Sequence, residues 1–187
     1  MSSISMLLFL NPLVKSPTVA NFLSTSRVLI SFALLFLVIF GDISKILIFY
    51  LCSIALVTDF LDGKVARMRK TTNYGSILDP EADSFFTLTL CIVIYKTQIP
   101  WLWVLIPGVL RYSFVIIVKI FNLKIEKLKP TFRAKCVCGI SAPLLTLALL
   151  PFIPAHIAIV LCLATAVLLV YSFSIDLNIL SKRLYEQ

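Results

Sequence analysis

Two long apolar segments of the chain are joined by the stretch DFLDGKVARMRKTTNYGSILDPEAD, residues 59–83. Four of the nine acidic residues of the chain are aspartates of this stretch: Asp59, Asp62, Asp79 and Asp83. A carboxylate at membrane depth costs about 2.5–3.5 kcal/mol even on the lenient insertion scale. Bound divalent cations are the simplest way to offset that cost, and cations held between two helices suggest chemistry on phosphate groups.

The composition indicates an integral membrane protein. Of the 187 residues, 60% are hydrophobic and only 14% are charged, whereas a soluble domain is about half apolar and about a quarter charged. Six spans of about 20 residues would use about two thirds of this length, so the chain fits a single domain, residues 1–187. We therefore predict an all-α integral membrane fold, a six-transmembrane-helix bundle.

Short polar segments set the boundaries of the predicted spans. The spans cover residues 22–40, 43–64, 76–95, 99–121, 132–152 and 156–178. Residues 1–17 are apolar, but the run is too short to cross a bilayer and contains Pro12. We expect this segment to form an N-terminal interfacial amphipathic helix that lies on the membrane surface.

The basic residues predict the orientation of the bundle. Most of them lie in segments 64–74 and 122–135 and near both ends of the chain, whereas the opposite connections contain only Lys45 and Lys96. By the positive-inside rule, both termini and the aspartate cluster face the cytoplasm, and a prokaryotic inner membrane suits this pattern. We expect the net charge of +8 to serve orientation and contact with anionic headgroups, not nucleic-acid binding.

On helices, the motif residues fall into two stripes. The first stripe places two carboxylates beside two small residues: Asp59, Asp62, Gly63 and Ala66. The second recurs at every fourth residue: Gly75, Asp79 and Asp83. The connection is short enough to make the helices antiparallel neighbours with facing stripes, and Arg67 at the mouth suits a phosphate or a base. A solvated helix end, with each aspartate paired to a nearby lysine or arginine, is the alternative, and it leaves the shared register unexplained.

This arrangement resembles the signature of the CDP-alcohol phosphatidyltransferase family, which reads D-x-x-D-G-x-x-A-R, a short spacer, then G-x-x-x-D-x-x-x-D. Every fixed position is filled in this chain: Asp59, Asp62, Gly63, Ala66, Arg67, Gly75, Asp79 and Asp83. A second element, Asn21 to Arg27, is similar to the family's N-x-L-T-x-x-R, with Ser24 in place of the threonine. The six-helix bundle of the family agrees with the predicted spans, so the resemblance covers most of the chain.

The resemblance implies transfer of the phosphatidyl group of CDP-diacylglycerol to an alcohol, with release of CMP. It implies two divalent metal ions, Mg or Mn, held by Asp59, Asp62, Asp79 and Asp83, and a general-base role for Asp83. The cytidine pocket would consist of Gly63, Ala66, Arg67 and Gly75. Further candidates for the site are Asn21, Ser24 and Arg27, for which a helix cap and a headgroup anchor are the alternative interpretations. The family also implies a homodimer.

The resemblance favours a small phosphorylated acceptor, glycerol 3-phosphate, which would give phosphatidylglycerophosphate. The run LDPEAD, residues 78–83, is similar to that of phosphatidylglycerophosphate synthases. Basic residues at corresponding places in that subgroup bind the acceptor phosphate, and here they are Arg111, Arg133 and Lys135. Ser84 and Tyr112 depart from the subgroup pattern, so serine, inositol and inositol phosphate stay open as acceptors.

A small cation transporter is the alternative from a different class, because aspartates within membrane spans also serve ion pathways. A conduction path needs polar residues through the full depth of the membrane. Here the outer halves of most spans are apolar, and the carboxylates gather at one end of two spans. This distribution favours a catalytic pocket that opens on one side of the membrane.

Overall fold

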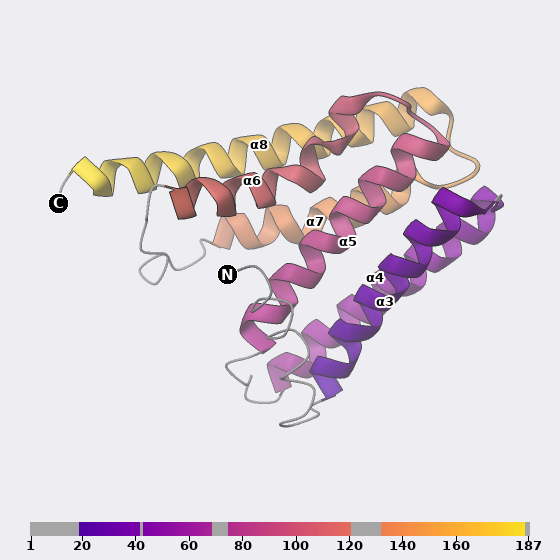
Figure 1. Cartoon of the computed structure of the whole chain (residues 1–187), viewed down its shortest axis with the longest axis horizontal. Coiled ribbons are helices and arrows are strands. Elements are labelled where there is room, and N and C mark those ends of the chain that lie inside the picture. Colours follow the sequence, from indigo (N-terminus) through magenta and orange to yellow (C-terminus); the bar gives the residue numbers. More distant parts are fainter. Residues whose placement is uncertain (1–18, 42, 69–74, 121–131, 186–187) are drawn as a thin grey trace.

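The computed structural model describes residues 19–41, 43–68, 75–120 and 132–185 (Figure 1). For residues 59–68 and 75–80, the description covers the backbone alone. Within the described part the fold is all-helical, as predicted, and contains these elements: α3 (Val19–Phe40), α4 (Lys45–Met68), α5 (Gly75–Thr97), η1 (Leu102–Leu105), α6 (Ile106–Ile120), α7 (Phe132–Ala148) and α8 (Ala155–Tyr185). The interfacial helix predicted for residues 1–17 lies outside the described residues.

Local chemistry explains where several helices begin. The carbonyl oxygen and Oγ of Ser44 accept hydrogen bonds from the backbone N–H of Leu47, so α4 begins at Lys45 rather than at residue 43. Within the predicted span 99–121, the 3-10 helix η1 precedes an α-helix that begins at Ile106. Pro107 is the second residue of that helix, where a missing N–H leaves no intrahelical bond unmade.

Helix α5 is the centre of the bundle. It packs against α3, α6, α7 and η1, and Figure 1 shows it between the α3–α4 pair and the group formed by α6, α7 and α8. Four of its residues around one turn have no exposed surface: Leu90, Cys91, Val93 and Ile94. These side chains cover one broad face of α5, whereas Leu88 and Ile92 on the opposite face are only partly buried.

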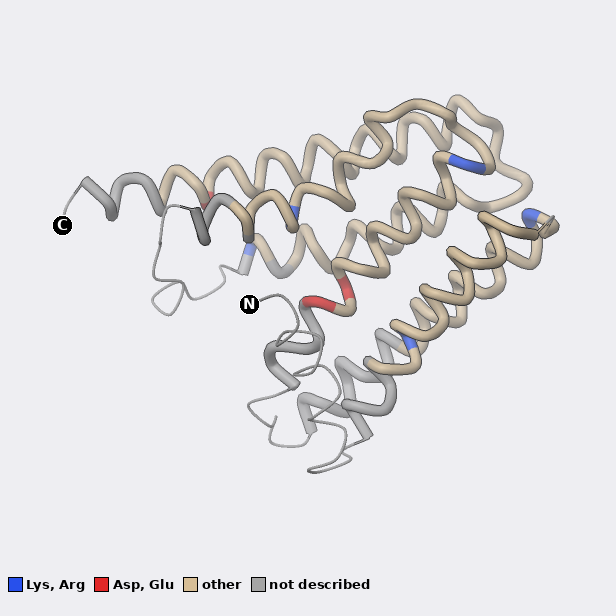
Figure 2. Tube along the Cα trace, in the orientation of Figure 1, with Lys and Arg blue, Asp and Glu red and all other residues tan. Residues whose placement is uncertain are grey.

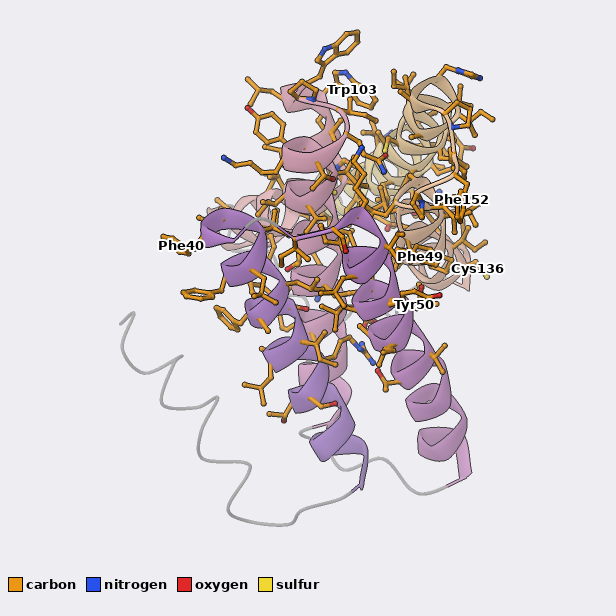
Figure 3. All side chains as sticks on the ribbon, turned by 90° about the vertical axis from the view of Figure 1, so that its right-hand side faces the viewer. Phe40, Phe49, Tyr50, Trp103, Cys136 and Phe152 are labelled. Atoms are coloured by element: carbon orange, nitrogen blue, oxygen red, sulfur yellow. The ribbon has the colours of Figure 1, made fainter. Side chains whose placement is uncertain are left out.

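The outer surface of the bundle is apolar. Phe40, Tyr50 and Phe152 are 75%, 60% and 87% exposed, and Figure 3 shows them on the outside of the helices. Soluble monomers rarely expose large contiguous apolar areas, so this surface is typical of a protein surrounded by lipid. By length and composition, one described helix can cross a bilayer, over Ala155–Ile179, and the other apolar helical stretches are shorter. Six spans therefore remain a prediction.

The hydroxyl groups are satisfied within their own helices. Ser31, Thr89, Thr146 and Thr165 each donate to the carbonyl oxygen four residues earlier, at 2.8–2.9 Å. This bond removes the need for a water partner, which hydrocarbon cannot supply. The polar side chains of the helix interiors therefore cost little in a membrane.

Helices α5 and α6 are in close contact at Gly108. A Cβ atom built on Gly108 would lie 2.7 Å from both Cα and Cδ1 of Leu88. The Cα atom belongs to the backbone of α5 and cannot move aside as a side chain can. Glycine at this position therefore sets the distance between α5 and α6. Gly139 on α7 is different, because a Cβ there meets no atom within 4 Å.

We predict that Gly108→Ala lowers the apparent melting temperature of the detergent-purified protein by roughly 2–10 °C, because overpacking costs about 1–3 kcal/mol. Gly139→Ala is the matched control and should melt at or above the wild-type temperature, since alanine is favoured over glycine in helices by about 1 kcal/mol. Thermal melts of the three proteins, followed by circular dichroism, measure this difference. Equal melting of Gly108→Ala and wild type would contradict the proposed close contact.

Candidate active site

Both halves of the aspartate motif lie on helical backbone, as predicted. Helix α4 is continuous through Asp59 and Ala66, and α5 begins at Gly75 and continues through Asp83. Figure 1 shows that α4 and α5 run in opposite directions, with the end of α4 and the start of α5 at the same end of the bundle. The periodicity of each predicted stripe is therefore present in the backbone.

The described contacts of these two helices are chiefly with other helices, and their direct contact at the motif stays a prediction. The main contacts of α4 are with α3 and α7, and both of these helices also pack against α5. The two motif helices are thus linked chiefly through shared neighbours. For seven motif residues the structure describes the backbone alone: Asp59, Asp62, Gly63, Ala66, Arg67, Gly75 and Asp79. That the stripes face each other stays a prediction.

Asp83 is held by an arginine from another helix. Arg27 of α3 donates a hydrogen bond from Nη1 to Oδ1 of Asp83 on α5. The Arg27 side chain is 2% exposed, whereas that of Asp83 is 54% exposed. A guanidinium inside an apolar bundle requires a counter-charge, and Asp83 supplies it. The headgroup-anchor interpretation of Arg27 is therefore wrong.

The start of α3 corrects a second interpretation. The helix begins at Val19, so Asn21 lies in its first turn rather than at the non-helical cap position. The cap interpretation of Asn21 is wrong. Asn21 and Ser24 share this helix with Arg27, and their side chains are outside the described ones.

Glu81 forms a second ion pair, on another face of α5. Its Oε1 accepts a hydrogen bond from Nη2 of Arg111 on α6, at 3.3 Å. Two residues of helix turn the chain by about 200°, so Glu81 and Asp83 meet different neighbouring helices. Glu81 therefore points away from the stripe that carries Asp83. Its pairing with Arg111 was not predicted, because Arg111 has no acidic neighbour in the sequence.

A third ion pair joins α7 to α8. Arg133 donates from Nη2 to Oδ1 of Asp176 at 2.8 Å and to the carbonyl oxygen of Ser172 at 3.5 Å. Sequence reasoning missed Asp176, although a lone acidic residue in the last apolar segment is a signal that a basic partner lies nearby. The side chain of Lys135, the third predicted acceptor residue, lies outside the described ones.

These charges belong to helices that pack against one another. Cys138 on α7 is within electrostatic reach of Arg111, Asp83 and Asp176, which belong to α6, α5 and α8. Figure 2 shows that charged residues are sparse elsewhere on the described part of the chain, which is mostly tan. The structure thus places two of the predicted site residues, Asp83 and Arg111, on adjacent helices of one polar region, in which Asp83 pairs with α3 and Arg111 pairs with Glu81 on another face of α5.

The donor set of this region suits a divalent metal ion. Carboxylate oxygens are the ligands that Mg and Mn prefer, and Asp83 presents a half-exposed carboxylate there. Among the described side chains, no three histidine, cysteine, aspartate or glutamate residues lie close enough together to hold a metal. Three of the four predicted ligands are not among those side chains, so the metal site stays a prediction. Guanidinium groups in the same region are suited to phosphate oxygens.

Comparison with known proteins agrees with this chemistry. The sequence model of the family described as CDP-alcohol phosphatidyltransferase matches residues 17–175. A CDP-diacylglycerol--glycerol-3-phosphate 3-phosphatidyltransferase of Haemophilus influenzae is 39% identical over 66 residues, which cover 35% of this chain and 35% of the relative. A probable cardiolipin synthase (CMP-forming) of Drosophila melanogaster is 32% identical over 101 residues, covering 53% of this chain and 31% of the relative. The matched segments thus span about a third of each relative, and no solved structure matches the chain.

The pair between α7 and α8 allows a charge-swap test. Arg133→Asp and Asp176→Arg should each lower the melting temperature by roughly 2–4 °C, corresponding to about 1 kcal/mol, because both side chains are partly exposed and screened. The double variant restores the pair with reversed polarity. It should recover more than half of the fall in melting temperature shown by the less stable single variant. Thermal melts of the four proteins measure this recovery. A double variant that loses the sum of both single effects would show that the two side chains do not interact.

Proposed function

The chain belongs to the CDP-alcohol phosphatidyltransferase family, and we propose that it transfers a phosphatidyl group from CDP-diacylglycerol to an alcohol and releases CMP. The observation that carries the proposal is the motif itself, with all fixed positions filled and both halves on helical backbone at one end of the bundle. Asp83, which belongs to the polar region, lies on α5, one of these two helices. The names of both relatives denote related lipid-forming activities.

In this proposal the motif aspartates hold two divalent ions, Mg or Mn. The ligands are Asp59, Asp62, Asp79 and Asp83. Bound there, the ions would neutralise the diphosphate of the donor and stabilise CMP as it leaves. The small residues Gly63, Ala66 and Gly75 leave room for the cytidine, and Arg67 binds its phosphate or stacks on its base.

Asp83 is the proposed general base, which takes the proton from the acceptor hydroxyl. Its half-exposed carboxylate is accessible to a polar acceptor, and the hydrogen bond from Arg27 fixes the position of one oxygen. Fixing a base in one orientation favours proton transfer, because the reacting atoms need not be ordered during the reaction. Arg27 is therefore proposed as a positioning residue for Asp83.

Glycerol 3-phosphate is the proposed acceptor, bound through its phosphate by Arg111, Arg133 and Lys135. The name of the Haemophilus influenzae relative states this acceptor. The name of the Drosophila melanogaster relative gives a different lipid product, so phosphatidylglycerol is the second candidate. We further propose six membrane spans, a homodimer, and an active site on the cytoplasmic side of a prokaryotic inner membrane. The apolar outer surface and the position of the basic segments support this arrangement.

The activity is tested by CMP release. Purified protein is incubated with CDP-diacylglycerol, Mg or Mn, and one acceptor from this panel: glycerol 3-phosphate, serine, inositol, inositol phosphate or phosphatidylglycerol. We expect metal-dependent CMP release with glycerol 3-phosphate and its loss on addition of EDTA. Folded protein that releases no CMP with any acceptor would contradict the transferase activity.

Two aspartate variants provide the controls. Asp62→Asn should abolish CMP release and leave the melting temperature near that of the wild type, because it removes a proposed metal ligand without changing side-chain volume. Asp42→Asn makes the same change in charge between α3 and α4, outside the motif, and should retain activity. A fully active Asp62→Asn variant would remove the metal assignment.

A further inference from the structure

Arg111 is incompletely paired in the described structure. Its hydrogen bond from Nη2 to Glu81 lies at 3.3 Å, the long end of the range for N–H···O bonds. Its Nε is buried, and no described residue accepts a hydrogen bond from it. A buried donor without an acceptor destabilises the folded protein. The Arg111 guanidinium therefore has room for a better acceptor than Glu81 provides.

The two nitrogens point to the shape of that acceptor. Nε and Nη2 lie on the same edge of a guanidinium, and their N–H bonds are nearly parallel. An anion with two oxygens, such as a phosphate group, can accept both bonds at once, which is the strongest arrangement that arginine makes. In the structure Glu81 occupies only the Nη2 position. Of the two donors on this edge of Arg111, only Nη2 has an acceptor among the described residues.

The position of Arg111 fits an acceptor whose hydroxyl must reach Asp83. Arg111 pairs with Glu81, which precedes Asp83 by two residues on α5, so a small molecule bound to the guanidinium would lie at the same level of α5 as the proposed base. Glu81 is 41% exposed and Arg111 is 31% exposed. Both side chains are therefore accessible to an incoming ligand.

We propose that Glu81 is an exchangeable counter-ion of Arg111 and thereby determines acceptor specificity. The phosphate of the acceptor takes the place of the Glu81 carboxylate on the Nε–Nη2 edge of Arg111. This inference rests on the proposed function, because it assigns Arg111 to the acceptor. A neutral alcohol cannot make the exchange, since it would leave a partly buried guanidinium without a counter-charge. The site therefore selects acceptors that carry a phosphate group.

The Arg133–Asp176 pair supplies a matched comparison. Arg133 makes a shorter bond to its carboxylate, 2.8 Å, and a second bond to the Ser172 carbonyl oxygen. With two acceptors on α8, this arginine is fixed to its neighbouring helix. Asp176 therefore positions Arg133 for the acceptor phosphate without being displaced, whereas Glu81 yields Arg111 to the ligand.

The test compares Glu81→Gln with Asp176→Asn in the CMP-release assay on the full chain. Glu81→Gln removes the competing charge and should lower the KM for glycerol 3-phosphate at least threefold, while the KM for CDP-diacylglycerol does not follow it. Asp176→Asn makes the same change of carboxylate to amide on the fixed pair and should not lower either constant. A parallel arm with phosphatidylglycerol vesicles distinguishes a lipid phosphate from a soluble one. A drop confined to that arm assigns the exchange to the lipid acceptor.

Two results in this assay would overturn the exchange. An unchanged or raised KM for every phosphate-bearing acceptor in Glu81→Gln would show that Glu81 only braces Arg111. Equal drops in Glu81→Gln and Asp176→Asn would show a general effect of net charge on the site.

A binding measurement separates failure of the exchange from failure of the proposed function. Cys138 is exposed, whereas Cys52, Cys91 and Cys162 are buried, so maleimide labelling of Cys138 can be located by mass spectrometry. If no acceptor yields CMP, the concentration of inorganic phosphate that protects half of Cys138 from labelling is compared in the two proteins. A concentration at least threefold lower in Glu81→Gln than in wild type still supports the exchange. Protection at equal concentrations, or none in either protein, overturns it.

Discussion

The structure depends on one constraint: an arginine inside an apolar helix bundle must find a carboxylate on a neighbouring helix. Each of the three described arginines meets this requirement, through Asp83, Glu81 and Asp176. Two of these carboxylates belong to α5, two residues apart, so the central helix is joined to α3 on one face and to α6 on another. The third pair joins α7 to α8. The cost of burying charge favours the pairing of α3 with α5 through Arg27, and the partly exposed pairs of Arg111 and Arg133 add smaller contributions to the other helix contacts.

The same constraint connects the fold to the proposed chemistry. Three carboxylates of the described polar region are paired with three arginines, and the proposal adds divalent cations that Asp83 shares with the other three motif aspartates. The phosphate groups of the donor and the acceptor would then bind to the divalent cations and the arginines. In such a bundle the apolar outer surface can contact the acyl chains of a lipid substrate, and the charged residues at one end can bind its headgroup. Glycine at position 108 supports this arrangement, because it lets α6 approach α5 near the Arg111–Glu81 pair.

The sequence predicted the helices better than their partners. Composition and periodicity placed six helical segments, and the motif spacing predicted stripes that the helical backbone of α4 and α5 supports. Ser44 and Pro107 shifted two helix starts by local chemistry that a hydropathy pattern does not contain. The pairs Glu81–Arg111 and Arg133–Asp176 span 30 and 43 residues of sequence, and no local signal joins residues so far apart. The neighbours of α5 depend on packing, which loop lengths alone do not determine.

The central claim is that acidic stripes on α4 and α5 hold metal ions beside Asp83. The most direct measurement is an experimental structure with Mn and a CDP-lipid analogue, in which anomalous scattering locates the metal. The account predicts manganese peaks coordinated by Asp59, Asp62, Asp79 and Asp83, with the diphosphate of the analogue on the same ions. Aspartate side chains directed to different helices, with manganese absent from the space between them, would contradict it.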